Sequence, residues 1–412
     1  MNDQNGSRII CRTLERLGVD CVFGLPGTQT IELYEALRRS SLRTILTTNE
    51  LAAAFMANGY ARASGRAGVL ITIPGPGFAY AIAGLAEAFF DSVPLVHIVP
   101  KPAPMPGRES ARQSIDQARI AGPVVKSVYE IDCATNLESA LADACRTAMT
   151  GEPGPVLVQI ADHVFSDRLP GTHGVRAELS IAGMRGIPPR APEQAGPKFP
   201  DIAPPTAAAF FAALQEAMPA DGVLVADSGR HQVLARAHFQ ALPPRGFIVP
   251  SDFQSMGFGL PAAIGAKLAS PRRSVVALIG DGGFAMSGME LLTAVRHDIP
   301  LTVIVFNDGA LGQIRLEQIT AFGFEHATSL INPDFEMFAE AFGVDYFRLS
   351  GDAVDMLRQA IHGGGVSLVE VRLRESSALH IRRAKTLARN TGSRIMGPRF
   401  AGRLKRWLKA RR

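Results

Sequence analysis

The amino-acid sequence predicts an α/β protein with two doubly wound parallel-sheet domains. In two separate stretches of the chain, short runs rich in Val, Ile and Leu alternate with segments of helical periodicity, as in parallel strands joined by helices. Between these stretches, residues 166–202 show no sustained periodicity, and positions 166–200 contain six Pro and five Gly. A chain of 412 residues has room for two or three domains. We interpret residues 166–202 as a linker rather than a third domain, because they lack a regular pattern.

The first domain is predicted over residues 1–165. Its apolar runs are short and bounded by turn residues, as expected for strands that are buried on both faces. Strands are predicted at residues 21–24, 44–48, 67–73, 94–99 and 155–160, and helices near residues 30–39, 51–64, 79–88 and 135–149.

The second domain is predicted over residues 203–375, where the alternation resumes. Apolar residues at helical spacing predict a helix from Met286 to His297. This helix joins two apolar runs, so residues 275–306 are expected to form a strand–helix–strand unit with a right-handed crossover. Strands are predicted at residues 222–227, 246–250, 275–279, 301–306, 344–347 and 366–371.

Residues 376–412 are predicted to form a basic tail. Residues 381–412 contain twelve Lys and Arg and no acid, so the net charge of +5 leaves the rest of the chain mildly acidic. We favour a terminal helix that is solvated or docked on a partner, with contact to an anionic membrane as the alternative; no nucleic acid partner is expected. The four cysteines lack metal-site spacing, and no signal peptide or long apolar span is visible, so we expect a cytoplasmic setting.

Two carboxylates follow neighbouring strands of the predicted second sheet. Asp281 comes after the run at residues 275–279, and Asp308 comes after the run at residues 301–306. Both are expected at one sheet edge, where open α/β sheets bind ligands and where a cation relieves the repulsion between two carboxylates. Gly282 and Gly283 leave backbone N–H groups for a phosphate, and hard oxygen ligands beside a phosphate favour Mg²⁺. The alternative is that both acidic residues belong to ordinary turns.

Together these features resemble the diphosphate-binding motif of thiamine diphosphate enzymes, in which a GDG turn is followed by a segment of similar length and two asparagines. Asn307 matches the first asparagine, whereas Asp308 stands where the second, metal-binding asparagine is expected. The additional negative charge requires an offset, for which Arg230 or His231 are the candidates. The resemblance implies that Mg²⁺ is bound by Asp281, Asp308 and Ala310.

Further motifs are similar to acetolactate synthase and its relatives, in the expected order over most of residues 15–165 and 220–320. They include TTNELAAAFMANGYARASGRAGVLITIPGPG in the first domain, and SGRHQVLARAHF and SMGFGLPAAIGAKLA in the second. The resemblance implies thiamine diphosphate and Mg²⁺ as cofactors, a pyrimidine-binding first domain and a diphosphate-binding second domain. The cofactor-binding residues that it implies are Pro26, Gly27, Glu50, Pro74, Gly75, Gly77, Gly229, Arg230, His231, Met256, Gly257, Gly280, Asp281, Gly282, Gly283, Asp308, Ala310 and Leu311.

Glu50 is the first of two candidate catalytic residues. It opens a predicted helix, where an acid also stabilises the helix N-terminus without any catalytic role. The resemblance implies that Glu50 hydrogen-bonds N1′ of the aminopyrimidine and so favours the tautomer that removes the C2 proton. Met256 matches the apolar side chain that bends the coenzyme by wedging between its rings, although a plain core methionine is the alternative.

Gln113 is the second candidate catalytic residue. It matches a pattern that continues with Asp116 and Lys126, and a surface glutamine on a helix fits its surroundings equally well. Arg315 follows the metal motif and is either a fork for a substrate carboxylate or an exposed cation. His97 lies in an apolar run, so we expect a satisfied core histidine.

The chain resembles acetolactate synthase large subunits but lacks the middle domain of the full-length members. Because the family uses that domain heavily to bind FAD, we expect no FAD here. In the family, Glu50 and Asp281 of one site would come from different chains, which implies a homodimer or homotetramer. We expect a carboligase that acts on a 2-oxo acid; the alternatives are a decarboxylase that releases an aldehyde and a non-catalytic or regulatory subunit with the same fold.

Overall fold

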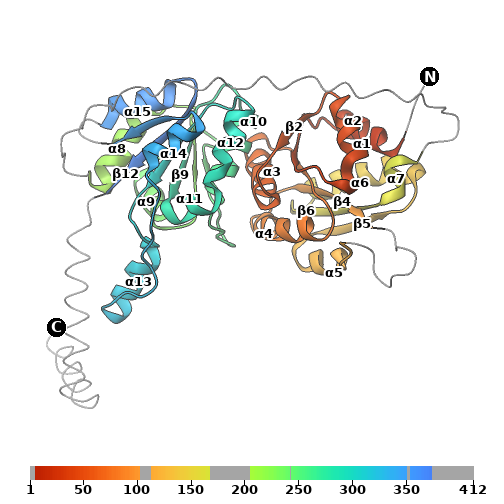
Figure 1. Ribbon diagram of the computed structural model, residues 1–412, viewed down its shortest axis with the longest axis horizontal. Coiled ribbons are helices and arrows are strands. Elements are labelled where there is room, and N and C mark those ends of the chain that lie inside the picture. The colour runs from red at the N-terminus through yellow and green to blue at the C-terminus, as the bar shows by residue number, and fades with distance from the viewer. Residues whose placement is uncertain (1–4, 103–112, 168–204, 242, 350–352, 374–412) are drawn as a thin grey trace, which may run out of the picture.

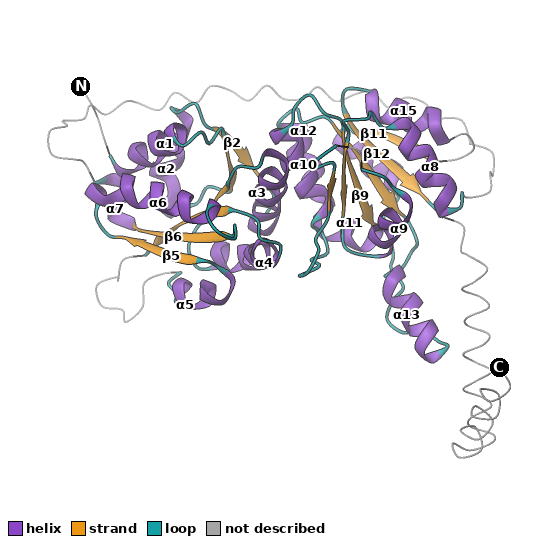
Figure 2. Ribbon diagram, turned by 180° about the vertical axis from the view of Figure 1, so that it is seen from behind, coloured by secondary structure: helices purple, strands orange, loops and turns teal. Residues whose placement is uncertain are grey.

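The computed structural model describes residues 5–102, 113–167, 205–241, 243–349 and 353–373. Nearly all of the predicted linker at 166–202 and the whole predicted tail at 376–412 lie outside these residues. The described chain forms two six-stranded sheets, and every strand pair in them is parallel. Helices pack on both faces of each sheet (Figures 1 and 2). The prediction of two doubly wound α/β sheets is therefore confirmed.

The first sheet has the strand order β2-β1-β3-β4-β6-β5. Its strands are β1 (Cys21–Gly24), β2 (Arg43–Leu46), β3 (Gly68–Ile71), β4 (Leu95–Lys101), β5 (Ser127–Ile131) and β6 (Pro155–Ala161). The helices around it are α1 (Gly6–Arg16), η1 (Thr28–Thr30), α2 (Ile31–Arg38), α3 (Glu50–Ser64), α4 (Pro76–Phe90), α5 (Gln117–Ala121), η2 (Gly122–Val124), η3 (Ala134–Asn136), α6 (Leu137–Met149) and α7 (Asp162–Ser166).

The second sheet has the order β11-β12-β10-β9-β7-β8. Its strands are β7 (Val223–Ala226), β8 (Phe247–Ile248), β9 (Val275–Gly280), β10 (Leu301–Phe306), β11 (Asp345–Arg348) and β12 (Val366–Val371). The helices around it are α8 (Ala207–Ala217), α9 (Arg230–His238), α10 (Gly259–Ala269), α11 (Asp281–Ser287), η4 (Gly288–Glu290), α12 (Leu291–Arg296), α13 (Gly312–Phe322), α14 (Phe335–Phe342) and α15 (Ala353–His362).

The two sheets share one topology. Read in the opposite direction, the second order is β8-β7-β9-β10-β12-β11, which repeats the first order strand for strand. Helices α3 and α10 therefore hold equivalent places, because each connects the second strand of its sheet in sequence to the third. By the same reasoning, α4 is equivalent to the segment that contains α11, η4 and α12.

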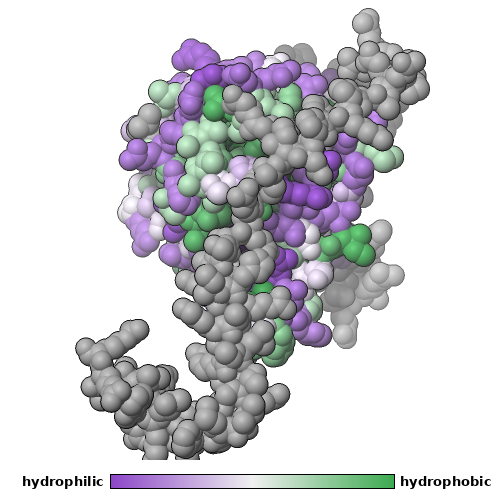
Figure 3. Space-filling model, turned by 90° about the vertical axis from the view of Figure 1, so that its left-hand side faces the viewer, coloured by the Kyte–Doolittle hydropathy of each residue, from purple (hydrophilic) through white to green (hydrophobic). Residues whose placement is uncertain are grey.

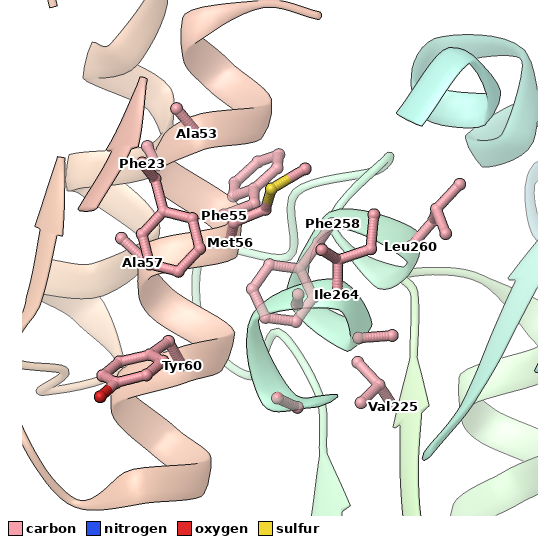
Figure 4. Packing of buried hydrophobic residues seen from close by; sticks show 14 of the residues in the cluster. Phe23, Ala53, Phe55, Met56, Ala57, Tyr60, Val225, Phe258, Leu260 and Ile264 are labelled. Atoms are coloured by element: carbon pink, nitrogen blue, oxygen red, sulfur yellow. The ribbon is translucent and has the colours of Figure 1, made fainter. Parts of the chain in front are cut away.

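The two domains meet where α3 packs on α10, a contact that we call the domain seam (Figure 1). Figure 4 shows Phe55 and Met56 of α3 beside Phe258 and Ile264, and the Phe55 and Phe258 ring centroids are 5.4 Å apart. Buried residues from both sheets belong to one continuous cluster across this contact. The seam therefore stabilises both domains together, since its apolar surface is removed from water only when they are joined.

One local expectation from the sequence was wrong, and one strand was not predicted. The helix predicted from Met286 to His297 begins at Asp281 and is divided into α11, η4 and α12. Apolar spacing could not locate the start, because Gly282 and Gly283 carry no side chain to contribute to the pattern. Strand β5 was missed because it is a partly exposed edge strand with a mixed polar sequence, Ser127–Ile131.

Within the described ranges, none of the helices is both long and apolar enough to cross a membrane. On the end of the molecule formed by the second domain, hydrophobic and hydrophilic residues are interspersed (Figure 3). All four cysteines lie in the described part of the chain, and each is a free thiol.

Candidate active site

The carboxyl ends of β9 and β10 bring the two halves of the predicted metal motif together. Gly280 pairs in register with Phe306, so Asp281 and Asn307 are the next residues on neighbouring strands. Asp281 is only 2% exposed, and its Oδ1 accepts a hydrogen bond of 2.9 Å from the backbone N–H of Gly282. The register thus places Asn307, rather than Asp308, directly beside Asp281.

The side-chain amide of Asn332 links Asp281 to Asn307. It donates to Asp281 Oδ2 at 2.8 Å and to Asn307 Oδ1 at 2.9 Å. Asn307 in turn donates to Glu370 Oε1 at 2.7 Å. Sequence reasoning missed Asn332 and Glu370, because they lie 25 and 63 residues beyond Asn307 and have no spacing that points to the motif.

Asp308 lies beside Arg230. Their nearest side-chain atoms, Arg230 Nη1 and Asp308 Oδ2, are 3.7 Å apart, so Arg230 supplies the positive charge expected beside Asp308. The following segment, residues 309–311, pairs with residues 328–330 through Leu311 N–H to Thr328 O and Leu330 N–H to Gly309 O, both 2.8 Å. This pairing fixes the backbone of Ala310, whose carbonyl is the third predicted metal ligand.

A cavity of about 330 Å³ opens at this edge of the second sheet. Its lining comes from the turns that follow β7, β9 and β10, from the loop before α10, from α9 and α13, and from Leu373 after β12. The carboxyl ends of parallel strands are where such sheets bind ligands. The described residues that line it all belong to the second domain. Those predicted from the sequence are Gly229, Arg230, His231, Met256, Gly280, Asp281, Gly282, Gly283, Asp308, Ala310 and Leu311.

Glycines make room at the bottom of this cavity. A Cβ placed on Gly282 would lie 2.7 Å from Leu311 Cδ2 and 3.3 Å from Met256 Cε. A Cβ on Gly280 would lie 3.1 Å from His231 Nδ1. A ligand can therefore approach the backbone here only because both positions lack a side chain.

His231 presents an unpaired nitrogen at the cavity. The residue is 5% exposed, and among the described residues its Nε2 has no hydrogen-bond partner. Burial lowers the pKa of His231 to about 4, so the ring is neutral near pH 7. A buried polar atom without a partner points to a ligand that provides one.

Asp227 holds the loop that carries Met256. Its carboxylate is fully buried and accepts the backbone N–H groups of Gly257 at 2.9 Å and Phe258 at 3.0 Å. Burial raises the pKa of Asp227 to about 7, against the effect of these hydrogen bonds. Gly257 does not line the cavity, but its positive φ of 79° allows the turn after Met256.

The predicted residues of the first domain form a separate cluster. Glu50 is the first residue of α3, after the N-cap Asn49, which accepts the Ala52 N–H at 2.8 Å. Glu50 Oε1 lies 2.9 Å from where a Cβ on Gly77 would be, so Gly77 gives the carboxylate its space. A Cβ on Gly27 would lie 2.3 Å from Ile73 Cγ2. The turn at residues 26–27 therefore packs closely against Ile73, the residue before Pro74.

Gln113 belongs to this cluster rather than to a helix surface. Its backbone is left-handed, with a φ of 61°, and its carbonyl oxygen lies 2.5 Å from where a Cβ on Gly75 would be. The Gln113 side chain accepts a hydrogen bond from Gln29. Sequence reasoning missed Gln117, which is buried and whose side-chain oxygen accepts the Gly75 N–H at 3.3 Å.

Four other residues singled out from the sequence make contacts outside the cavity lining. Asp116 caps α5, and Lys126 donates to the Thr147 and Thr150 carbonyls at 2.6 and 2.7 Å. Arg315 is 24% exposed and lies 3.6 Å from Glu325, so it is neither free in solvent nor in the cavity lining. His97 is fully buried and bonded to Thr72 at 2.8 Å, with its Nδ1 left without a described partner.

Two family models match this chain. The N-terminal thiamine pyrophosphate-binding domain of thiamine pyrophosphate enzymes matches residues 4–120, and the C-terminal thiamine pyrophosphate-binding domain matches residues 227–371. Together they cover more than half of the 412 residues. The chain therefore belongs to the thiamine pyrophosphate enzyme family.

Similar curated proteins include synthases and a decarboxylase. The acetolactate synthase large subunit of Lactococcus lactis is 24% identical over 84% of this chain and 88% of its own length. The acetolactate synthase isozyme 2 large subunit of Escherichia coli is 26% identical over 82% of this chain and 90% of its own length. The probable 2-ketoarginine decarboxylase AruI of Pseudomonas aeruginosa is 27% identical over 88% of this chain and 93% of its own length. These alignments span 493 to 524 positions, more than the 412 residues of this chain, so the relatives contain residues that this chain lacks.

The cavity residues fit the diphosphate of thiamine diphosphate. The Arg230 guanidinium and the glycine-lined backbone suit a phosphate. Among the described residues, no group of three or more His, Cys, Asp or Glu could hold a metal ion. A divalent cation here therefore needs further ligands in addition to carboxylates, such as the Ala310 carbonyl and phosphate oxygens.

Proposed function

We propose that this chain is a thiamine diphosphate- and Mg²⁺-dependent carboligase that decarboxylates a 2-oxo acid and joins the remaining fragment to a second carbonyl compound. The observation that carries the proposal is the gathering of Asp281, His231 and Met256 around one glycine-lined cavity. Most of the relatives named above are acetolactate synthases, which supports carboligation.

In this proposal, each group of residues has a separate task. Arg230 and His231 hold the diphosphate, while Asp281, Asp308 and the Ala310 carbonyl hold Mg²⁺. Met256 holds the coenzyme bent, and Glu50 holds a proton at N1′ of the aminopyrimidine. When bound, the coenzyme supplies the carbanion and the electron sink for decarboxylation. Gln113, beside Gly75 in the Glu50 cluster, is the candidate polar contact for the substrate.

We propose a homodimer or homotetramer in which Glu50 of one chain faces the cavity of another. No described residue of the first domain lines the cavity of its own chain, which supports this arrangement. Phe90 of α4 and Phe253 of the second domain are both exposed and stack with centroids 5.6 Å apart. An aromatic pair exposed across two domains is typical of surfaces that another copy covers. A cytoplasmic setting accords with four free thiols.

A 2-oxo acid decarboxylase that releases an aldehyde is the second candidate, supported by the similarity to the probable 2-ketoarginine decarboxylase. Both reactions share the decarboxylation step, and pocket shape decides whether a second carbonyl is admitted.

Two measurements separate these candidates. Thiamine diphosphate binding is measured by titration calorimetry with and without Mg²⁺ and without FAD, and we expect binding that requires the cation. CO₂ release and products are then measured on a panel of small 2-oxo acids with and without an added aldehyde. A coupled product supports the carboligase and a free aldehyde the decarboxylase. Binding without CO₂ release, or no binding, contradicts both and leaves a non-catalytic or regulatory subunit.

A further inference from the structure

Two buried glutamates reach across the domain seam from equivalent places in the two domains. Glu87 lies near the end of α4, and Glu290 lies in η4, within the segment that is equivalent to α4. Both side chains are fully buried. Each accepts hydrogen bonds from the loop that precedes the seam helix of the other domain. This reciprocity follows from the shared topology of the two sheets.

Glu87 of the first domain holds the loop before α10. Its Oε2 accepts the backbone N–H of Ser255 at 3.0 Å. Asp91, the C-cap residue of α4, accepts the N–H groups of Ser251 at 2.9 Å and Asp252 at 3.0 Å. Ser255 directly precedes Met256. The N–H of Gly257, which directly follows Met256, donates to the carboxylate of Asp227. Met256 thus stands between two backbone groups that are fixed by buried carboxyl groups from different domains.

Glu290 of the second domain holds the loop before α3 in the same way. Its Oε1 accepts the Thr48 backbone N–H at 3.0 Å as well as the Thr48 hydroxyl, and its Oε2 accepts the Thr293 hydroxyl at 2.6 Å. A second contact follows at His297, whose Nε2 accepts the Leu46 N–H at 3.0 Å. Thr48 lies two residues before Glu50, so this loop sets where α3 begins.

We propose that Glu87 and Glu290 are reciprocal positioning residues, each of which fixes, from the other domain, the loop that presents one active-site side chain: Met256 for Glu87 and Glu50 for Glu290. The inference rests on the proposed function for the roles of Met256 and Glu50. Neither glutamate touches the cavity, since neither belongs to its lining. Both act through backbone hydrogen bonds.

The acceptor oxygen, and not the negative charge, is what this role requires. Burial raises the pKa of both Glu87 and Glu290. Glu87 Oε1 has no described hydrogen-bond partner, so one oxygen of that carboxyl is enough for the contact. A glutamine keeps an acceptor oxygen of the same reach, whereas an alanine leaves the loop N–H unpaired in a buried place. The glutamine variants therefore serve as conservative controls.

Hydrogen–deuterium exchange of the full-length protein tests the contact itself. In Glu87→Ala we expect amide exchange in residues 253–256 to rise about tenfold or more while residues 47–50 stay protected, and the reverse in Glu290→Ala. Both glutamine variants should stay within about twofold of the wild type. Each alanine variant is thus the control for the other. Equal acceleration of both loops, or of neither, would overturn the proposal.

A double-substitution cycle tests whether Glu87 acts through Met256. We expect Glu87→Ala to lower kcat about tenfold in the wild-type background but less than about twofold in Met256→Ala. Glu290→Ala should lower kcat by a similar factor in both backgrounds. An undiminished effect of Glu87→Ala in Met256→Ala would overturn the link to Met256. If Met256→Ala alone leaves kcat unchanged, the proposed role of Met256 fails, while the exchange experiment still decides whether the glutamates hold the loops.

Discussion

Asn332 shows how one residue can organise a site without any sign in the sequence. Its amide joins Asp281 to Asn307, which belong to two different strand ends, and it comes from the loop between α13 and α14. The motif predicted Asp281 and Asp308 at this edge because strand ends could be read from the apolar runs. The register of β9 and β10, which puts Asn307 opposite Asp281, could not be read in that way.

Glu50→Gln provides the first prediction at the level of single residues. The amide keeps the size of Glu50 but cannot share a proton with N1′ as a carboxyl group does, so we expect turnover to fall by about 10²-fold or more. Thiamine diphosphate affinity should stay within about threefold of the wild type, because the proposed diphosphate contacts come from the other domain. Steady-state kinetics and titration calorimetry measure the two quantities. Glu32→Gln, at an exposed position on α2, is the control; turnover unchanged in Glu50→Gln would rule out the assigned role.

His97 gives a prediction on pH. Burial lowers the pKa of His97 to about 3, from an ordinary value of 6.5, so the folded state keeps the ring neutral while the unfolded state takes up a proton below about pH 6.5. Its contribution to stability is therefore present above pH 6.5 and is lost as the pH falls toward 3, by about 1.4 kcal/mol per pH unit.

The measurement is the free energy of unfolding in urea at about pH 7 and about pH 5.5, for the wild type and for His97→Gln. The glutamine can keep a hydrogen bond to Thr72 but does not titrate. We expect the wild type to lose about 1–1.5 kcal/mol more than the variant between the two pH values. The contribution of His231 has the same sign but is common to both proteins, so it cancels; equal losses in both would contradict the prediction.

At the level of elements, α3 and α10 approach each other so closely that their backbones touch. A Cβ on Gly59 would lie 2.0 Å from the Ala262 carbonyl oxygen, and a Cβ on Gly265 would lie 1.9 Å from the Met56 carbonyl oxygen. The sequence predicted α3 from its periodicity, but periodicity does not say which helix packs on which. The small residues of NGYARA and AAIGAKLA make sense only once the two helices are seen together.

Gly265→Ala tests this contact. The added methyl group must push the helices apart, because the nearest atoms are backbone atoms that cannot rotate away. We expect a loss of about 1–3 kcal/mol or more in the free energy of unfolding, measured in urea, although alanine is the better helix former. Gly122→Ala is the matched control, since its Cβ would meet no atom within 4 Å. A stability equal to that of the wild type would show that the helices can separate freely.

For the whole molecule, the fold and many of the second-domain residues that line the candidate cavity could be predicted because they depend on local patterns: apolar runs, and a motif confined to two neighbouring strand ends. The residues that connect the domains could not. Glu87 and Glu290 contact loops of the other domain that lie 168 and 242 residues away in sequence. Each is a buried acid within an apolar pattern, and only the tertiary structure shows what it binds.

The proposed sharing of sites between chains gives a prediction for the assembly. Glu50→Gln and Asp281→Asn should each be nearly inactive as homo-oligomers. In a mixed dimer carrying one chain of each, purified through two different affinity tags, one site receives both native residues and the other receives both substitutions. We expect about half the wild-type activity per mixed dimer. If the mixed dimer is as inactive as its parents, then Glu50 and Asp281 of the same chain must serve the same site.

The glycine contact between α3 and α10 also limits how the protein can move. Helices whose main chains touch cannot slide or rotate past each other without collision, so the seam is poorly suited to act as a hinge. We therefore expect that the segment from residue 309 to 332, rather than the seam, moves when a ligand enters the cavity. That segment includes α13, which extends away from the body of the protein and buries only Ile319 (Figure 1). Movement of this segment, rather than rotation of whole domains, would then limit the rates at which the proposed coenzyme binds and dissociates.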